Sequence, residues 1–245
     1  MDELGQSKNR EYYDAFAANY EAARGEHNRG GYHDLVDELE AEFVRRFATG
    51  REVLEVGCGT GLVLERIQRF ARVARGVDIS PKMLERALER RLDVQLASAT
   101  ALPFADATFD VACSFKVLAH VREIETALAE MARVVRPGGH VLAEFYNPWS
   151  LRALVKRLGP AGRVAAGVKE SNVFTRYDSP RDVSRLIPSD LRLVDSRGVR
   201  ITIPSAAVMR VPGVRDVFRF AEQRLCDSAL GRFGGFWIAA LQKQH

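Results

Sequence analysis

The feature that most constrains the fold of this 245-residue chain is a short apolar run that leads directly into a glycine-rich turn. Val53–Val56 predicts a buried strand, and Leu62–Phe70 has the amphipathic pattern of a helix. Between them, Gly57, Gly59 and Gly61 provide positions where the backbone can take a positive φ or approach a ligand without an intervening Cβ. A strand, a glycine turn and a helix in this order are typical of sheet proteins that bind a nucleotide-like ligand at the end of the first strand.

The rest of the chain alternates short apolar strands with helices, which predicts an α/β fold with a doubly wound, mostly parallel, seven-stranded sheet and helices on both faces. Pro137, Gly138 and Gly139 predict a turn between the helix Ile124–Val135 and the next strand. Strands or strand material are expected at Val53–Val56, Val73–Val77, Val94–Ala97, Phe109–Ser114, His140–Phe145, Leu191–Val194, Val199–Ile203 and Phe236–Leu241. Further helices are expected after Pro81 and near Val214–Ala229.

Two helices precede the first strand, over residues 10–24 and Tyr32–Phe47. In the first, Tyr12, Phe16 and Tyr20 recur every four residues, so they form one aromatic stripe on the helix. The organisation expected is an N-terminal helical lid over residues 1–48, a cofactor-binding core over 49–148, an inserted substrate cap over 149–190 and the C-terminal part of the core sheet over 191–245.

Composition favours one globular domain, with 47% hydrophobic and 28% charged residues. The chain has no apolar run long enough for a membrane helix and no signal-like N-terminus, so we expect a cytoplasmic protein.

Cys58, Cys113 and Cys226 are odd in number and widely spaced, which favours buried thiols over disulfides. The histidines form no short-spaced ligand pair, so no metal site is expected.

Basic residues are concentrated after the fifth predicted strand. Residues 151–200 contain eleven Lys and Arg against five Asp and Glu, whereas the whole chain carries a net charge of only +4. This excess indicates either an ordinary solvated surface or an electropositive cap that favours an acidic or phosphate-bearing acceptor.

The glycine spacing distinguishes between cofactors. Dinucleotide-binding enzymes use G-x-G-x-x-G, whereas this chain has G-x-G-x-G with Glu55 two residues before the first glycine. Asp78 ends the second strand, twenty-one positions after Gly57, where an ionised carboxylate can accept both hydrogen bonds of a ribose diol. The alternative role of Asp78 is to cap the helix beginning near Pro81, but Ser80 is the better residue for that cap.

The whole nonapeptide from Val53 to Gly61 closely resembles the first motif of class I S-adenosylmethionine-dependent methyltransferases. Ala97–Phe104 resembles the third motif of their small-molecule "type 11" branch, with Ser98 in place of the Asp that contacts adenine. Phe109–Ser114 followed by Val117–Val121 is similar to the fourth motif, and Arg133–Gly139 is similar to the helix and turn that follow.

This resemblance implies S-adenosylmethionine as cofactor, with its methionine part over the glycine turn. It also implies His120, just past the fourth strand, as a candidate general base, although a residue packed under the cofactor fits that position equally well. The cofactor-binding residues implied are Tyr20, Glu55, Gly57, Cys58, Gly59, Gly61, Asp78, Ile79, Met83, Ser98, Ala99, Ser114 and Phe115.

Acceptor contacts are expected from the N-terminal helix, from the end of the fifth strand and from the cap. The pattern Y-Y-D-x-x-A-x-x-Y resembles the N-terminal lid of many small-molecule methyltransferases, although its aromatic stripe is also explained as the buried face of a docked helix. Side chains at the end of the fifth strand and in the cap complete the expected set, since ligands of open α/β sheets lie beyond the carboxyl ends of strands. The acceptor residues expected are Tyr12, Tyr13, Tyr146, Asn147, Trp149, Phe174, Arg176 and Tyr177.

The activity expected is methyl transfer to oxygen, nitrogen or carbon of a small acidic, aromatic or carrier-linked molecule, by a monomer or homodimer. An RNA or protein methyltransferase is an alternative, disfavoured because Ser114–Val117 replaces the N/D-P-P-Y type tetrapeptide and no RNA-binding domain is added. A non-catalytic S-adenosylmethionine-binding protein is a second alternative. A nicotinamide enzyme is a third, disfavoured by the glycine spacing and by Leu102–Phe104.

Overall fold

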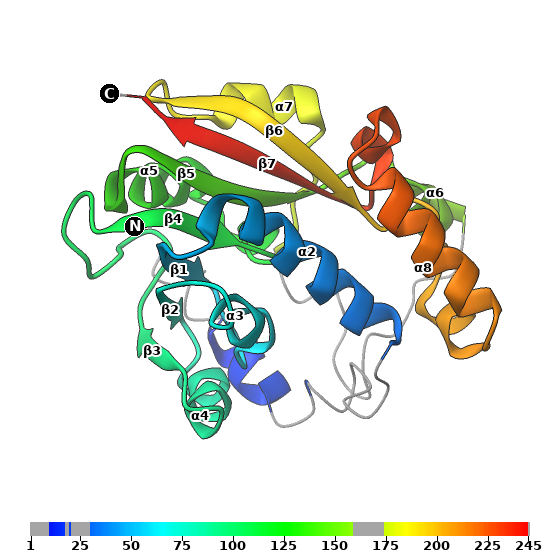
Figure 1. Ribbon diagram of the computed structural model, residues 1–245, viewed down its shortest axis with the longest axis horizontal. Helices are drawn as coiled ribbons and strands as arrows, with labels where there is room; N and C mark the ends of the chain where they lie inside the picture. Colours follow the sequence, from blue (N-terminus) through cyan, green and yellow to red (C-terminus); the bar gives the residue numbers. More distant parts are fainter. Residues whose placement is uncertain (1–9, 18–19, 21–29, 159–173, 245) are drawn as a thin grey trace.

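The computed structural model describes residues 10–17, 20, 30–158 and 174–244 (Figure 1). Residues 10–17 and Tyr20 are helical, as the aromatic stripe predicts. The rest of the helix expected over residues 10–24, and residues 159–173 of the expected cap, lie outside the described residues.

A seven-stranded sheet with the order β3-β2-β1-β4-β5-β7-β6 forms the centre of the molecule. Neighbouring strands from β3 to β5 are parallel, and β7 is antiparallel to both β5 and β6. The predicted α/β fold with a mostly parallel sheet is therefore confirmed. The strands are β1 (Glu52–Val56), β2 (Val73–Asp78), β3 (Asp93–Leu96), β4 (Phe109–Ser114), β5 (Val135–Tyr146), β6 (Leu191–Val199) and β7 (Phe236–Lys243).

Helices cover both faces of the sheet, because alternate residues of its central strands are buried in opposite directions. Val53 and Val111 pack on one side with α2 (Tyr32–Ala48), and Leu54 and Ala112 pack on the other with α5 (Ile124–Val134). The remaining helices are α3 (Leu62–Ile67), α4 (Pro81–Glu89), α6 (Leu151–Leu158), α7 (Pro180–Leu186) and α8 (Val214–Leu225), with short 3₁₀ turns η1 (Leu118–His120), η3 (Ala206–Arg210) and η4 (Ala229–Phe233). Among the described residues, no helix has the length and apolar character needed to cross a membrane.

The parallel strands end at one edge of the sheet, and β7 begins at the same edge because Phe236 lies opposite Tyr146. The chain crosses from β1 to β2 on one side and returns to β4 on the other, so a crevice is expected beyond the ends of β1 and β4. The candidate site lies at this edge.

Two local predictions were wrong. Strand β5 begins at Val135 and runs through Pro137–Gly139, which were expected to form a turn, with an irregular register opposite β4. A Cβ at Gly139 would lie 2.5 Å from the backbone oxygen of Asp110, so glycine permits this close strand pairing. The strand expected over Val199–Ile203 ends at its first residue, Val199, because Arg200, with φ of +61°, turns the chain out of β6.

Candidate functional site

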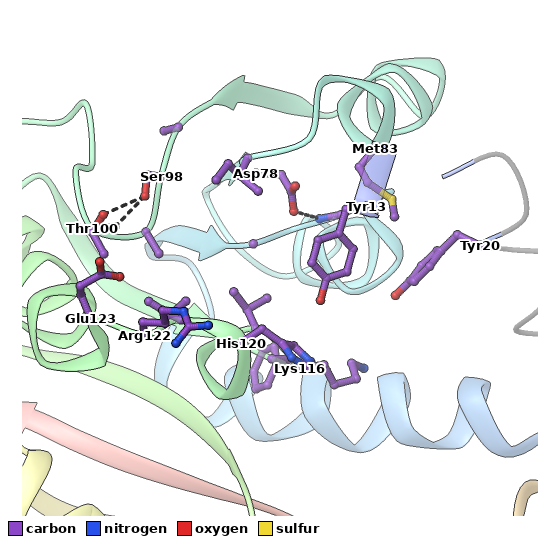
Figure 2. Close-up of a pocket in the computed structure, with 18 residues that line it drawn as sticks. Tyr13, Tyr20, Asp78, Met83, Ser98, Thr100, Lys116, His120, Arg122 and Glu123 are labelled. Carbon is purple, nitrogen blue, oxygen red and sulfur yellow. Dashed lines mark hydrogen bonds between the residues drawn. The ribbon is translucent and has the colours of Figure 1, made fainter. Parts of the chain in front are cut away.

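A cavity opens beyond the carboxyl ends of β1, β2 and β4 (Figure 2). Its empty space, including the part open to solvent, is about 960 Å³. Its lining comes from the N-terminal helix, the glycine turn, the ends of β2 and β3, and the segment after β4. The lining residues are Tyr13, Tyr20, Gly57, Gly59, Asp78, Ile79, Met83, Ala97–Thr100, Phe115–Val117 and His120–Glu123.

The glycine turn has the backbone that its sequence predicts, with φ of +77° at Gly57, +54° at Gly59 and +84° at Gly61. A Cβ at Gly57 would lie 2.3 Å from Val117 Cγ2, so this glycine lets the turn pack against the segment after β4. A Cβ at Gly59 would meet no atom within 4 Å and would point into open space. Gly61 is the N-cap of α3, and a Cβ there would lie 2.2 Å from Leu92 Cδ1, so its role is in packing.

Asp78 joins the glycine turn to the cavity. Its Oδ2 accepts a hydrogen bond from the Gly59 backbone N–H at 2.8 Å, and its Oδ1 accepts one from Ser80 N–H at 2.9 Å. Burial raises the pKa of Asp78, because the charged form loses hydration. Ser80 Oγ caps α4 by accepting from Met83 N–H, so Asp78 is not needed as the cap. Each carboxylate oxygen retains a lone pair for a ligand.

Ser98 and Ala99 lie on the wall formed by the end of β3, together with Ile79 and Met83. Ser98 Oγ lies 2.9 Å from Thr100 Oγ1 and accepts a hydrogen bond from the Thr100 backbone N–H at 3.2 Å. The hydroxyl that replaces the family's Asp is therefore already held within its own turn. Ser114, in contrast, is buried, donates to Val56 O at 2.9 Å and is not among the described lining residues.

His120 has a defined orientation at the cavity wall. Its Nδ1 lies 2.9 Å from the backbone oxygen of Phe174, and its Nε2 lies 3.5 Å from the Tyr146 hydroxyl. A carbonyl oxygen only accepts hydrogen bonds, so the contact with Phe174 requires a proton on Nδ1. In the neutral ring, Nε2 then carries the lone pair.

The N-terminal helix lies against the cavity through Tyr13 and Tyr20. Figure 2 shows the Tyr13 hydroxyl pointing toward His120, and the two ring centroids are 6.4 Å apart. Asp14 fixes the helix to α4 by accepting a hydrogen bond from Ser80 Oγ at 2.5 Å. Tyr12 packs edge-on against Tyr13 and is not among the described lining residues.

A smaller cavity adjoins the first and shares five of its lining residues, namely Tyr20, Gly57, Gly59, Phe115 and Lys116. It contains Glu55 and Cys58 from the predicted set. Glu55 Oε2 and Thr60 Oγ1 are buried in its wall and have no hydrogen-bond partner among the described residues. Sequence reasoning missed Thr60, Asp37 and Lys116, all of which line this smaller cavity, which we call the annex.

Several of the expected acceptor residues do not line the cavity. Tyr146 and Phe174 surround His120, although neither is among the described lining residues. Asn147 is buried and donates from Nδ2 to Arg232 O at 2.7 Å, so its side chain holds the loop of η4. Three further expected residues, Trp149, Arg176 and Tyr177, are not among the described lining residues. Trp149 is 47% exposed and Tyr177 is 40% exposed. Arg176 forms an ion pair with Asp178 at 2.7 Å.

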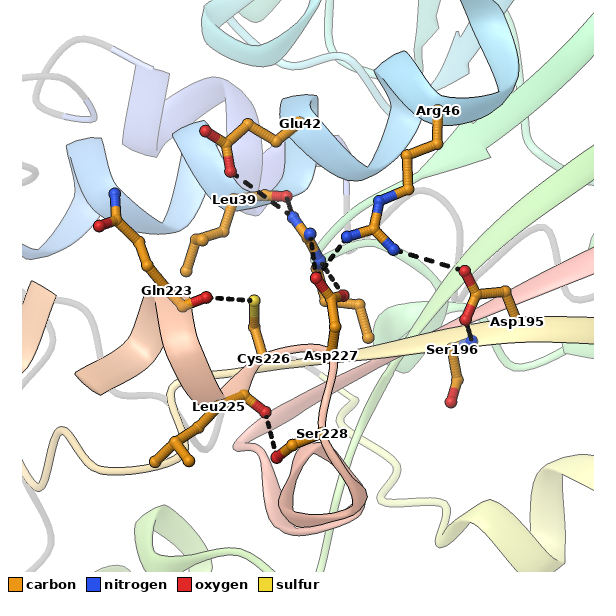
Figure 3. A network of polar contacts seen from close by, with 11 residues as sticks. Leu39, Glu42, Arg46, Asp195, Ser196, Gln223, Leu225, Cys226, Asp227 and Ser228 are labelled. Atoms are coloured by element: carbon orange, nitrogen blue, oxygen red, sulfur yellow. Dashed lines mark hydrogen bonds and ion pairs between the residues drawn. The ribbon is translucent and has the colours of Figure 1, made fainter. Parts of the chain in front are cut away.

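The excess of basic residues over 151–200 is partly explained by ion pairs inside the fold. Arg197 is only 4% exposed and pairs with Asp227 at 2.7 Å while donating to Leu39 O at 2.8 Å (Figure 3). Together with the pair between Arg176 and Asp178, this contact shows that the excess is not all available to an acceptor.

Known proteins provide an independent comparison. The sequence matches the family described as "Methyltransferase domain" over residues 54–143. The 27-O-demethylrifamycin SV methyltransferase of Amycolatopsis mediterranei (strain S699) is 30% identical over 250 residues, which cover 91% of this chain and 89% of the relative. The ubiquinone biosynthesis O-methyltransferase of Alkalilimnicola ehrlichii is 32% identical over 158 residues, which cover 61% of this chain and 64% of that protein.

Among solved structures, the same fold is found in a methyltransferase from Thermotoga maritima. That protein is described as S-adenosylmethionine-dependent and as a possible histamine N-methyltransferase. The TM-score is 0.69 at 19% sequence identity, and the match covers 95% of this chain and 98% of the other.

Proposed function

The chain belongs to the class I S-adenosylmethionine-dependent methyltransferases, and on this premise we propose that it methylates a hydroxyl oxygen of a small organic acceptor, with His120 as general base. The observation that carries this proposal is the hydrogen bond between His120 Nδ1 and Phe174 O. It supports a ring orientation in which, in the neutral form, the other nitrogen carries the lone pair.

The residues present fit the cofactor. S-adenosylmethionine supplies, when bound, a methyl group on a positively charged sulfur. Asp78 would hold the ribose diol, and Gly59 leaves space for close approach to the turn. The unpartnered Glu55 Oε2 and Thr60 Oγ1 provide buried acceptors for an ammonium group in the annex.

His120 would act on the acceptor in two ways. Its Nε2 would accept the hydroxyl proton as the new oxygen–carbon bond forms, and its fixed ring would orient the oxygen. The Tyr146 hydroxyl, 3.5 Å from Nε2, is a second polar group that can hold the ring or the acceptor at this point.

The chemistry of the wall supports an aromatic or polycyclic acceptor. Near His120, the cavity is lined by the aromatic side chains of Tyr13 and Phe115 and by the aliphatic side chains of Val117 and Val121. The cavity wall also contains the basic residues Lys116 and Arg122, so an acidic group on the acceptor is compatible with it, although Arg176 and Arg197 of the basic stretch are engaged in ion pairs. The names of the two sequence relatives, which specify O-methylation of small molecules, agree with oxygen as the acceptor atom.

A methyl-transfer screen tests this function. The purified protein is incubated with S-adenosylmethionine carrying a deuterated methyl group and with panels of phenols, aliphatic alcohols, amines and carboxylic acids, and products are identified by mass spectrometry. We expect labelled methyl ethers. Products formed only from amines, RNA or protein would contradict the proposal, and no transfer to any panel would favour a non-catalytic cofactor-binding protein.

His120→Asn tests the base. We expect kcat to fall by about 10²–10⁴-fold, the usual contribution of a positioned general base, with cofactor affinity changed less than about twofold. His33→Asn is the matched control, because His33 packs beside Tyr32 on α2 and is not among the described lining residues. Full activity in His120→Asn would remove the base from the mechanism while leaving methyl transfer itself intact.

A further inference from the structure

Two arginines of the basic stretch over residues 151–200 lie close together without an acidic partner. Arg152, at the start of α6, and Arg200, just after β6, flank the backbone of Gly235. A Cβ built at Gly235 would lie 3.3 Å from Arg152 Cδ and 3.4 Å from Arg200 Cδ. Neither arginine forms an ion pair with any of the described residues. Since two neighbouring cations repel each other, their close approach indicates a place for an anion.

The guanidinium of Arg152 has unused hydrogen-bond donors. Its Cζ lies 4.7 Å from the centroid of the Tyr146 ring and 4.9 Å from that of Phe236, and these two residues are paired across β5 and β7. Nε and Nη1 of Arg152 are buried and have no hydrogen-bond partner among the described residues. Aromatic rings attract the charge but do not replace the hydrogen bonds that these donors would form with water. The two donors therefore lack an acceptor.

Arg200 is held in place by neutral groups. Its Nε and Nη2 donate to two backbone oxygens at 3.2 and 3.0 Å, and its Cζ lies 5.0 Å from the centroid of the Tyr32 ring. Glu222 on α8 approaches the same loop, but its carboxylate accepts hydrogen bonds from the backbone of Ile201 and Thr202 and forms no ion pair with Arg200. The contacts fix the side chain of Arg200 and leave its charge without a counterion among the described residues.

The positive field of the two arginines extends over the neighbouring tyrosines. Burial raises the pKa of both Tyr32 and Tyr146, and the charge of Arg152 opposes that shift at both residues. The charge of Arg200 also opposes it at Tyr32. A negative group placed between these rings would be stabilised by the same field.

The arginine pair adjoins the proposed general base through Tyr146. The Tyr146 hydroxyl lies 3.5 Å from His120 Nε2. The centroid of the Tyr146 ring lies 5.5 Å from that of the His120 ring and 4.7 Å from Arg152 Cζ. The imidazole and the guanidinium are therefore no further apart than these last two distances together, a separation that one small acceptor can span.

We propose that Arg152 and Arg200 bind an oxyanion of the acceptor, a carboxylate or a phosphate, and thereby select acidic hydroxy compounds. The unused donors of Arg152 would form charge-assisted hydrogen bonds with the anion, and Arg200 would add a second positive charge. An acceptor anchored in this way would present its hydroxyl at His120. This inference rests on the proposed function and names the class of acceptor as small aromatic acids.

Matched acceptors test the selection of acids. In the labelled methyl-transfer screen, hydroxybenzoic acids are compared with the corresponding hydroxybenzamides, which have nearly the same shape without the charge. We expect kcat/KM for the acids to exceed that for the amides by about tenfold or more, the order expected for hydrogen bonds to a charged group. Equal rates, or faster transfer to the amides, would overturn the inference and leave the proposed O-methylation intact.

Variants of the two arginines locate the effect. Arg152→Gln and Arg200→Gln should each reduce the preference for acids by about fivefold or more, since each removes one cation, whereas Arg152→Lys should retain part of the preference. A purely structural role would slow transfer to acid and amide alike and leave their ratio unchanged. Arg224→Gln is the matched control, because Arg224 also lies over an aromatic ring, that of Phe220 at 5.2 Å, but is exposed on α8. An unchanged ratio in both Gln variants would overturn the inference.

Calorimetric titration with benzoate tests the anion site without methyl transfer. The full chain is saturated with S-adenosylhomocysteine, which has no methyl group to donate, and benzoate and inorganic phosphate are titrated separately. We expect benzoate to bind the parent protein and Arg224→Gln, and to bind Arg152→Gln about tenfold more weakly. This result would support the site even if the screen found no methylated product. Binding of phosphate alone, binding of neither anion, or benzoate binding that Arg152→Gln leaves unchanged would overturn the assignment to the acceptor.

Discussion

The proposed cofactor side and the proposed acceptor side of the cavity are built in different ways. On the cofactor side, Gly57 and Gly59 are neighbours in the chain, and Asp78 is held to their turn by a backbone hydrogen bond. On the acceptor side, His120 depends on Phe174 and Tyr146, which are 54 and 26 residues away in sequence. A contiguous backbone turn can be inferred from local sequence, whereas a set of side chains converging from distant segments requires the tertiary structure.

The largest effect that would test this contrast is expected from Gly59→Ala. Its Cβ would project into the open space of the cavity, and we expect S-adenosylmethionine affinity to fall by about a hundredfold, the order of effect of blocking close approach to the backbone. Gly138→Ala is the control, because Gly138 has a similarly positive φ, of +78°, and a Cβ there also meets no atom within 4 Å. Both variants should lose similar stability, but only Gly59→Ala should lose binding, measured by calorimetry. Normal binding in Gly59→Ala would show that the cofactor does not approach this turn.

Glu55→Gln should have a smaller effect that depends on pH. In the free protein, burial and the nearby Glu40, Asp37 and Asp78 raise the pKa of Glu55, while Lys116 opposes the shift. A bound cation favours the carboxylate, so cofactor binding releases a proton and strengthens as pH rises. The variant should bind S-adenosylmethionine about tenfold more weakly than the parent protein at high pH, a factor that corresponds to a pKa difference of one unit. Its affinity should also change less with pH.

The carboxyl group of Glu55 should make the free protein less stable as pH rises, whereas it should make cofactor binding stronger. Because its folded-state pKa is raised, its contribution to the stability of the free protein is fully present below the ordinary glutamate pKa and is lost as pH rises through the folded value. Glu55→Gln should abolish that loss in thermal unfolding of the free protein. Glu52→Gln, at the other end of β1, is the control, because ion pairing with Arg136 lowers the pKa of Glu52. Identical pH profiles for binding in the Glu55→Gln variant and the parent protein would contradict this assignment.

A buried ion pair also joins β6 and the segment after α8 to α2, which carries Asp37 of the annex wall. Arg197 from β6 pairs with Asp227 after α8 and contacts the backbone of α2 at Leu39. We expect Arg197→Met to lower the free energy of unfolding by about 2 kcal/mol, less than for a fully buried pair because Asp227 is 37% exposed. Arg46→Ala, which removes an exposed partner of the same aspartate, should cost under about 1 kcal/mol. Equal losses in urea unfolding would remove the distinction between buried and exposed anchors.

The smallest effects on activity are expected from Trp149 and Tyr177, which the sequence suggested as acceptor contacts but which do not line the described cavity. Trp149→Ala and Tyr177→Ala should change KM for the acceptor found in the screen by less than about twofold, since substitutions of exposed residues away from a site have small effects. A tenfold increase in KM would extend the acceptor site beyond the described cavity, toward the predicted cap.

Much of the fold and of the cofactor side was predictable, because strand alternation, the glycine spacing and the position of Asp78 are local patterns. Asn147 shows the limit of such reasoning: its position at the end of β5 is as expected, but its side chain turns to Arg232 O. Lys116 was missed because its partners Asp37 and Glu40 come from α2, far away in sequence. One signal was present, since Glu40 lies four residues after Val36 and four before Val44, on the apolar face of its helix.

The orientation of His120 is the central claim of this account, and nitrogen NMR of the histidine ring tests it without knowledge of the acceptor. The protein is labelled with ¹⁵N-histidine, and the His120 signals are assigned by their loss in His120→Asn. We predict a neutral ring with its proton on Nδ1, bound to Phe174 O, and an unprotonated Nε2. A neutral ring with its proton on Nε2 would contradict the account, because His120 would then have no lone pair to accept the acceptor's proton.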